Sequence, residues 1–473
     1  LSYSVYSDLD WDNGKIVDRS LNDPDSPFPI KNFVINLEEN ESISLTASIN
    51  SKSIFYNQEK IDIISIADEN FAEYQKKYIE STSGEIVTYF ISEPMYMRGV
   101  RILQISVLPF QYKSDSKEYI LYNDMDLNIE IFQDSPINSQ NPILLSTEFD
   151  TLISSFVDNY DSRLRDQTIP SCILFICGGN SLNQVSMQNL IEWRKQMGYE
   201  VHVAEVGDIG NTTNSIKNFI QSAYENWDNP PEYVVLVGDT DGSYAIPYFS
   251  TTWGASDYDY TLIDGNDFFP EMFIGRISAN GASDLDNIIN KTIAYEKATY
   301  LSFTGTEWYE RAALNADPSS SGNSTIITNE YIEEILETNG FEEINTNFGD
   351  GNYANWMQNE LSQGILYMNY RGYIGTSGFG SGQINNANNG YMNPFATFIT
   401  CSTGDFNYTC LSEDFIRAGS ATNPKGAVAA IGTATSSTHT APNNILQMGI
   451  YDGIFSKGLT TAGSALVSGK VAL

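Results

Sequence analysis

The thiol of Cys401 stands where an apolar run ends and a Ser-Thr-Gly-Asp turn begins. The run, 395–400, is rich in β-branched and aromatic residues between Pro394 and Gly404, a pattern typical of a buried strand. In an open α/β sheet, ligands bind in crevices at the carboxyl ends of the strands. Cys401 is therefore a candidate nucleophile. The alternative is a small buried apolar residue, which free cysteines often are.

A cysteine nucleophile needs a base, because a free thiol is mostly protonated near neutral pH. The chain has only two histidines. His202 lies between two valines inside a predicted strand, 200–206, and we interpret it as structural. His439 lies in a small polar loop straight after a predicted strand at 427–432. Because consecutive parallel strands usually lie near each other and open on the same edge of the sheet, we expect His439 to reach Cys401.

A second cluster of polar residues follows the predicted strand at 233–237. It contains five carboxylates that hard cations favour as ligands: Asp239, Asp257, Asp264, Asp267 and Glu271. Such spacing suits a structural Ca²⁺ ion, although it is not the twelve-residue helix–loop–helix calcium loop. The alternative is a solvated acidic loop with Asx turns. The chemistry of a cysteine nucleophile requires no cofactor.

The amino-acid composition argues against some classes of binding partner. A formal net charge of −35 and a pI near 4.2 give a surface that repels nucleic acid and anionic membranes. There is no apolar run long enough to span a membrane. Four cysteines in 473 residues form neither a metal knuckle nor a disulfide framework, and Cys172 and Cys177 are predicted to be core residues.

Strands and helices must position these residues, and the predicted secondary structure changes in type along the chain. Residues 1 to about 145 show period-2 alternation between polar turns, which predicts an all-β sandwich or half-barrel. From about 168, strands alternate with helices, which indicates mainly parallel sheets covered on both faces. We predict a β-rich domain with its linker over 1–165, one α/β subdomain over 166–305, and a second beside it over 306–473 that carries Cys401. Arg163 and Arg165, at the junction, predict a processing site.

Several segments occur in the order found in one peptidase family. They are EYVVLVGD (232–239), DGNDFFPEMFIGRISA (264–279), GILYMNYRG (364–372), FITCSTGDF (398–406) and PKGAVAAIGTAT (424–435). With them, residues 168–460 resemble the gingipain-type cysteine peptidases, which have a caspase-like fold. The resemblance implies that residues 1–165 are a β-rich prodomain and that Arg163 or Arg165 is the activating cleavage site. It also implies a protein that is secreted or on a bacterial cell surface, with a catalytic domain that continues beyond Leu473.

The resemblance places Cys401 on the family's nucleophile and Asp317 near the carboxylate that orients the catalytic histidine in relatives. The family's Gly-His-Gly, however, is replaced by Gly372-Tyr373-Ile374. A phenol is neutral near pH 7 and is a poor general base there. His439 aligns instead with an aromatic residue that walls the substrate pocket in relatives.

Two hypotheses follow. In the first, the chain is the zymogen of a secreted cysteine endopeptidase, with protein or peptide substrates and with His439 as a relocated base. The backbone N–H of Cys401 and that of Gly372 or Tyr373 would stabilise the oxyanion, and Ser402 would contact the substrate. In the second, the site is inactive, and the chain is a gingipain-like surface protein that serves as a binding or adhesion module.

Overall fold

The structure is a computed structural model that describes residues 2–6, 30–56, 75–113, 115–116, 118–133, 143, 145–162, 170–252, 254–436 and 438–473. It divides into two compact units. The first comprises the described residues of 1–145, 153–163 and 264–269, and the second those of 146–152, 164–263 and 270–473. The predicted processing site, Arg163 and Arg165, lies outside the described residues.

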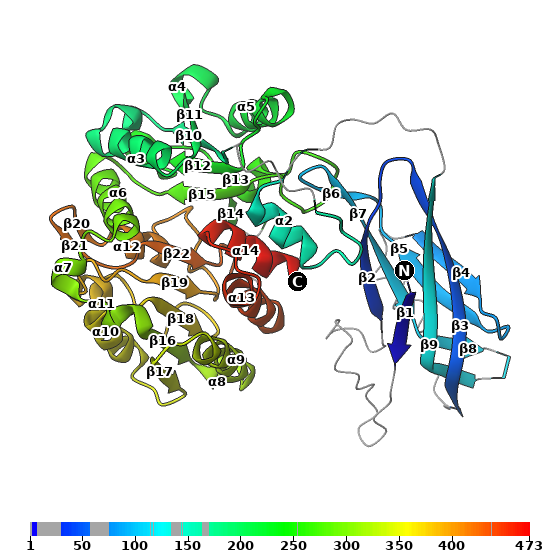
Figure 1. Ribbon diagram of the computed structural model, residues 1–473. Helices are drawn as coiled ribbons and strands as arrows, with labels where there is room; N and C mark the ends of the chain where they lie inside the picture. Colours follow the sequence, from blue (N-terminus) through cyan, green and yellow to red (C-terminus); the bar gives the residue numbers. More distant parts are fainter. Residues whose placement is uncertain are drawn as a thin grey trace. The chain divides into compact units, whose positions relative to one another are not determined.

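The first unit is a sandwich of two antiparallel sheets, seen in blue and cyan in Figure 1. One sheet contains β1 (Ser2–Tyr6), β9 (Glu118–Gln133) and β3 (Glu41–Tyr56), with β8 (Phe110–Lys113) also paired to β9. The other contains β2 (Lys31–Asn36), β7 (Val100–Leu108), β5 (Ile86–Ile91) and β4 (Gln75–Glu80), with β6 (Met95–Met97) paired to β7. Both sheets contribute to one core, which includes Phe33, Ile105 and Leu127. The predicted all-β sandwich is confirmed.

The second unit contains two parallel sheets, as predicted. The four-stranded sheet has the order β11 (Glu200–Glu205), β10 (Cys172–Cys177), β12 (Tyr233–Val237) and β15 (Phe273–Ile277). Every residue of β10 is buried, as its continuous apolar run predicts. On one face, Phe175 packs with Leu190 of α3 (Val185–Gln196) and Leu285 of α6 (Ala282–Lys297).

The five-stranded sheet carries the candidate nucleophile. Its order is β17 (Glu343–Phe348), β16 (Arg311–Ala316), β18 (Tyr367–Arg371), β19 (Phe395–Phe398) and β22 (Ala429–Gly432). Residues that alternate along a strand point to opposite faces, and Ala313 accordingly belongs to a different core from Ala312 and Leu314.

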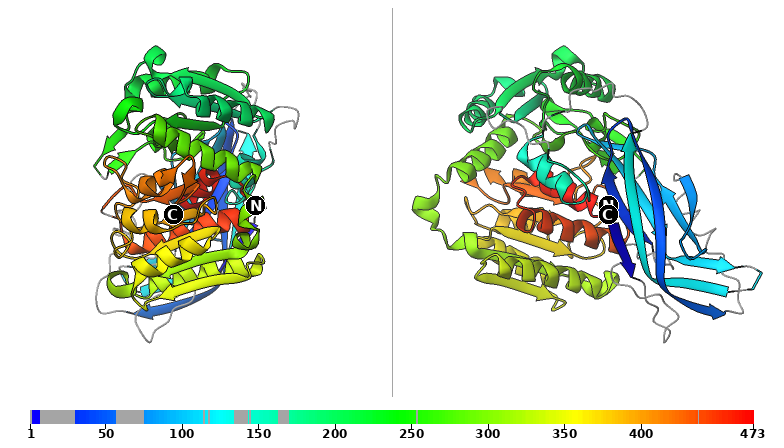
Figure 2. Two further views of the ribbon diagram at one scale, coloured as in Figure 1. Left: turned by 90° about the vertical axis from the view of Figure 1, so that its left-hand side faces the viewer. Right: turned by 45° about the vertical axis from the view of Figure 1, so that its right-hand side comes forward.

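Helices cover both faces of this sheet (Figures 1 and 2). The core that contains Ala313 includes side chains of α10 (Tyr353–Gln363), α11 (Ser381–Asn386) and α12 (Leu411–Arg417). The core on the other face includes side chains of α9 (Ser324–Thr338), α13 (Thr440–Phe455) and α14 (Ala462–Val471). In Figure 2, α13 and α14 are the red helices at the end of the chain.

The remaining elements are short or lie between the sheets' strands. They are α2 (Thr147–Ser154), α4 (Val206–Ile209), α5 (Thr213–Asn226), α7 (Leu301–Thr304), α8 (Pro318–Ser321), β13 (Phe249–Thr251), β14 (Gly254–Ser256), β20 (Gly419–Ser420) and β21 (Asn423–Pro424). Within the described ranges, no helix has both the length and the apolar character needed to cross a bilayer.

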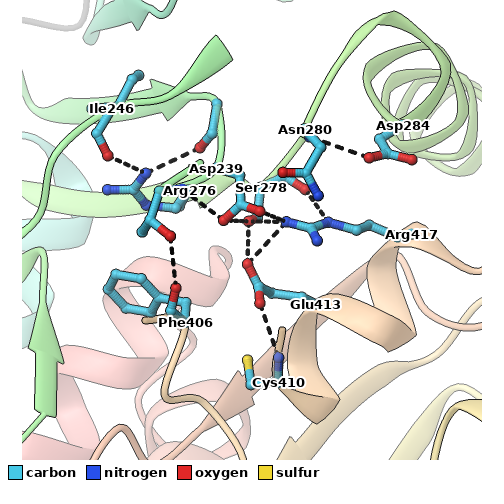
Figure 3. A network of polar contacts seen from close by, with 12 residues as sticks. Asp239, Ile246, Arg276, Ser278, Asn280, Asp284, Phe406, Cys410, Glu413 and Arg417 are labelled. Carbon is cyan, nitrogen blue, oxygen red and sulfur yellow. Dashed lines mark hydrogen bonds and ion pairs between the residues drawn. The ribbon is translucent and has the colours of Figure 1, made fainter. Parts of the chain in front are cut away.

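A buried polar network joins the two sheets of the second unit (Figure 3). Asp239 follows β12 and Ser278 follows β15, whereas Glu413 and Arg417 belong to α12 beside the other sheet. Arg417 Nη2 lies 2.6 Å from Asp239 Oδ2 and 2.9 Å from Glu413 Oε1. The Nε of the same arginine donates to the Ser278 carbonyl at 2.6 Å. One guanidinium therefore holds groups from both sheets.

Lys291 of α6 makes a second connection of the same kind. Its buried ammonium donates to the carbonyls of Ile416 at 2.6 Å and Lys425 at 2.9 Å. Ile416 belongs to α12, and Lys425 directly follows β21. A helix of the four-stranded half thus provides donors for backbone carbonyls of the five-stranded half.

We expect Asp239→Asn to lower the free energy of unfolding by about 3 kcal/mol at pH 7, because it leaves a buried cation with one carboxylate fewer. Burial alone would raise the pKa of Asp239, but the Thr240 N–H and Arg417 outweigh it and hold the pKa below its usual range. Such a group stabilises the fold fully above the ordinary Asp range and loses that effect as pH falls through the folded-state value.

The difference between wild type and Asp239→Asn should therefore shrink when urea unfolding is repeated near pH 3 instead of pH 7. Asp350→Asn, at an exposed position after β17, is the matched control and should change stability by less than about 0.5 kcal/mol. An equal loss at both pH values would show that Asp239 acts by packing and not by its charge.

Candidate active site

Cys401 lies just beyond β19 in a loop that two neighbouring loops hold. It is 6% exposed. On one side, Ile374 after β18 forms a parallel bridge with Cys401, and the Gly375 N–H donates to the Cys401 carbonyl at 3.3 Å. On the other side, the Ser402 N–H donates to the Thr435 carbonyl at 3.0 Å. The thiol therefore sits at the carboxyl edge of the sheet, where the sequence predicts it.

A close backbone crossing fixes the turn after Cys401. The Gly404 N–H donates to the Thr433 carbonyl at 3.0 Å, and a Cβ on Gly404 would lie 2.5 Å from the Gly432 carbonyl oxygen. Ser402, between thiol and crossing, has a left-handed backbone with φ 63°. That conformation costs a non-glycine residue on the order of 1 kcal/mol and persists only where the surroundings enforce it.

The described side-chain partner of the thiol is Thr438. Cys401 Sγ and Thr438 Oγ1 lie 3.5 Å apart, and Thr438 Oγ1 accepts a hydrogen bond from Asn443 Nδ2 at 2.9 Å. His439 is the next residue and caps the amino terminus of α13, where its Nδ1 accepts from the Ala441 N–H at 3.5 Å. The structure thus brings the loop of His439 to Cys401, and its role as base stays a prediction.

Asp317 and Tyr373 lie on the other side of the thiol. Asp317 follows β16 and caps α8, where its Oδ1 accepts from the Ser319 N–H at 3.0 Å. The hydroxyl of Ser377, in the loop that carries Tyr373, donates to its Oδ2. Burial would raise the pKa of Asp317, but the hydrogen bonds from Ser319 and Ser377 lower it. Its described partners place this carboxylate with the Tyr373 loop and not with His439.

The residues predicted to stabilise the oxyanion or to contact the substrate differ in their exposure and in their existing hydrogen bonds. Ser402, predicted to contact the substrate, has an exposed side chain, and its backbone N–H donates to the Thr435 carbonyl. Gly372 is buried, and its carbonyl accepts from Ser321 Oγ at 3.0 Å. Tyr373 is 58% exposed, which leaves its ring open to a substrate.

The sequence interpretation missed Arg371, which ends β18. Its side chain is fully buried, and it donates to the Ile399 carbonyl, two residues before Cys401. It also donates to Asn444 Oδ1 through Nε at 2.9 Å and Nη2 at 2.6 Å. The sequence did contain a signal that could have identified Arg371, namely an arginine at the end of an apolar strand in a chain with few cations. Asn444 gave none, because α13 was not predicted.

Four of the five candidate calcium ligands are bonded to other groups of the protein. Asp264 and Asp267 belong to the first unit, and Asp239, Asp257 and Glu271 to the second. Asp239 pairs with Arg417, and Asp257 pairs with Arg276 at 2.7 Å. Asp267 accepts the Tyr96 and Phe269 N–H groups, and Glu271 accepts the Ile263 N–H. In the part of the chain that the structure describes, no three such residues are placed to hold a metal ion, and the calcium prediction gains no support.

The comparison with known proteins begins with a family profile. The profile of Peptidase family C25 matches residues 170–473, which is most of the chain and all of the two parallel sheets. The chain belongs to this family. In the C25 region, Cys401, Arg371, Asp317 and His439 all fall inside the match, and so do the two loops that hold the thiol.

Relatives of this C25 chain include gingipains of Porphyromonas gingivalis. Gingipain R2 of strain W83 is 27% identical over 376 residues, which cover 76% of this chain and 50% of the relative. Lys-gingipain W83 is 26% identical over 361 residues, which cover 72% of this chain and 20% of the relative. The chain thus spans about half the length of the R2 relative that it matches.

Solved structures agree. The crystal structure of the Arg-specific cysteine proteinase gingipain R matches with a TM-score of 0.58 and 27% identity, over 65% of this chain and 73% of that one. The complex of Porphyromonas gingivalis RgpB pro- and mature domains matches with a TM-score of 0.57 and 27% identity, over 63% of this chain and 73% of that one. The predicted gingipain-type family and its caspase-like α/β fold are confirmed.

Proposed function

We propose that this chain is the zymogen of a cysteine endopeptidase in which Cys401 is the nucleophile and His439 is the base. The observation that carries the proposal is the 3.5 Å contact of Cys401 Sγ with Thr438, because the base candidate is the next residue along the chain. Membership of a peptidase family supports the reaction class. The substrates are proteins or peptides, and the side-chain preference is left open.

The reaction follows from this arrangement. His439 takes the Cys401 proton, and the thiolate attacks the carbonyl carbon of the scissile peptide bond. The carbon–nitrogen bond then breaks, the leaving amine takes the proton from His439, and water hydrolyses the thioester to release the acid and the thiol. In the structure His439 Nδ1 accepts from the Ala441 N–H at 3.5 Å. A base role requires a ring nitrogen to exchange this long contact for Cys401 Sγ, and the exposed ring has room to turn.

We also propose that the β sandwich is the prodomain and that the protein acts outside the cell or on its surface. The match to a complex of pro- and mature domains supports the first part. The acidic, lysine- and arginine-poor composition suits a protein that must stay soluble outside the cell. Asp317 would then hold the Tyr373 loop beside the nucleophile through Ser377.

The test is covalent labelling of Cys401 by a thiol-directed electrophilic peptide, read by mass spectrometry. We expect Cys401 to be labelled in wild type and His439→Ala to slow labelling about 10²-fold or more, as loss of a general base does. His202→Ala is the matched control, since His202 is the other histidine and pairs with Glu200 on β11. It should label at the wild-type rate.

Unchanged labelling in His439→Ala would overturn the relocated base. A wild-type chain that takes no label, either intact or after removal of the sandwich, would overturn the peptidase and favour a binding or adhesion module. The replacement of the family histidine by the exposed phenol of Tyr373 is the observation that gives this alternative its weight.

A further inference from the structure

The guanidinium of Arg371 is a buried charge whose described partners are all neutral. Its donors meet the carbonyls of Ile399, Gly372 and Thr440 and the side-chain oxygen of Asn444. Arg276 and Arg417 in this unit, with side chains 6% and 11% exposed, each pair with carboxylates instead. A buried charge without a counterion is costly. The fold retains one here, bonded to the end of the strand that leads to the candidate nucleophile.

The position of Arg371 identifies the anion that it would meet. Its bond to the Ile399 carbonyl holds the end of β19, two residues before Cys401. Burial lowers the pKa of Arg371 to about 10, although negative charge on Tyr370 or Cys401 would raise it. Opposite charges attract, so a cation held at this strand end favours an anion nearby. Arg371 remains charged near neutral pH.

Two further features favour an anion at the same atom. Thr438 Oγ1 already accepts a hydrogen bond from Asn443, so its own proton is available for Cys401 Sγ at 3.5 Å. Thr438 also immediately precedes the cap of α13, a helix of sixteen residues, whose amino terminus carries partial positive charge. A hydroxyl donor therefore contacts the sulfur atom. The residues that follow it in the chain begin a helix, and the first of that helix, Thr440, accepts a hydrogen bond from the cation.

The other titratable groups near the site do not replace Arg371. Burial raises the pKa of Tyr370 to about 12, which keeps its phenol neutral. The carboxylate of Asp317 is bonded to Ser319 and Ser377, and that of Asp405 accepts from the Ala255 N–H at 3.4 Å. His439 and Tyr373 are both exposed.

We propose that Arg371 is an electrostatic positioning residue that stabilises the Cys401 thiolate and fixes the first turn of α13. The inference rests on the proposed role of Cys401 as nucleophile. It adds a source of positive charge that is independent of any histidine, in a site where tyrosine stands at the family's histidine position. The same guanidinium holds Ile399 on the nucleophile strand and Thr440 and Asn444 on the helix that follows His439.

The variant Asn444→Asp adds a negative charge beside Arg371 while nearly keeping the shape of the side chain. The variant keeps the Oδ1 atom that accepts both hydrogen bonds from Arg371, at 2.6–2.9 Å, but makes it part of a carboxylate. The rate of iodoacetamide alkylation of Cys401 in the full chain is measured against pH, in a Cys410→Ala background so that the modified peptide carries one thiol. We expect the midpoint of the profile to move up by about one pH unit and the rate at pH 6 to fall about tenfold.

Two variants serve as controls. Arg371→Lys keeps the positive charge, and its profile should stay within about 0.3 pH unit of wild type on the same scale. Asn355→Asp adds a carboxylate at an exposed position of α10 and should leave the profile unchanged. Thermal unfolding of each variant verifies that it is folded.

An Asn444→Asp profile that superimposes on that of wild type, in a folded protein, would overturn the electrostatic role and leave Arg371 as a tie between strands and helix. Alkylation does not depend on turnover. A shifted profile in a chain that hydrolyses no peptide would therefore reject the proposed function while retaining this inference. An unshifted profile in a chain that does hydrolyse peptides would reject the inference alone.

Discussion

Cys401→Ala is expected to lower peptide hydrolysis by about 10⁴- to 10⁶-fold, the range found when a catalytic nucleophile is removed. The reason is that no other described thiol is placed to replace it. Cys172 and Cys177 lie on β10 in the other parallel sheet, and burial raises the pKa of Cys410 to about 12. The measurement is hydrolysis of a mixed-sequence quenched fluorescent peptide library, since the preferred side chain is not specified.

Cys410→Ala is the matched control for this loss. Cys410 lies nine residues further along the same loop, at the start of α12, and is as buried as Cys401. Its replacement should keep turnover within about threefold of wild type, since truncation of one small buried side chain costs stability more than chemistry. If Cys401→Ala still hydrolysed the library and Cys410→Ala did not, the nucleophile would be Cys410 and not Cys401.

Gly404→Ala is expected to lower both stability and turnover. An added Cβ would lie 2.5 Å from the Gly432 carbonyl oxygen, so the two backbones must separate. Overpacking of this kind costs about 1–3 kcal/mol. The separation also displaces Cys401 relative to Thr438, and a misplacement on the order of 1 Å costs about 10²-fold in rate. Urea unfolding and library hydrolysis measure the two effects.

Gly382→Ala is the control, because a Cβ on that residue of α11 meets no atom within 4 Å and alanine favours a helix. It should retain wild-type turnover and unfold at an equal or higher urea concentration. If Gly404→Ala matched it in both measurements, the crossing at Gly432 would not be what aligns the thiol.

Those parts of the fold whose sequence signal is strong could be predicted. Strands β10 and β12 are continuous apolar runs, and buried parallel strands have this pattern. Strand β17 was missed because EINTNF is largely polar and lies at the sheet edge, partly exposed. The end of β19 was also placed two residues too late, since Ile399 and Thr400 have strand-like side chains but already belong to the turn.

Helix α13 shows why the site was only partly predictable. Its sequence contains Pro442, two asparagines and two glycines, which disfavour a helix interior. Tertiary packing reverses that preference, because a Cβ on Gly449 would lie 2.9 Å from Gly469 Cα of α14, so the two helices touch at their glycines. The position of Cys401 followed from local pattern, whereas the partners of Arg371 lie on a helix that only this packing forms.

The network around Arg417 and Lys291 has a consequence for how this region can move. Its donors from one half of the catalytic unit are bonded to backbone carbonyls and carboxylates of the other at 2.6–2.9 Å. A hinge between the sheets would have to break these buried bonds together and leave charges without partners. The two sheets of this unit are therefore expected to move as one body, and the candidate site, which lies at the edge of one of them, keeps its distance from the other.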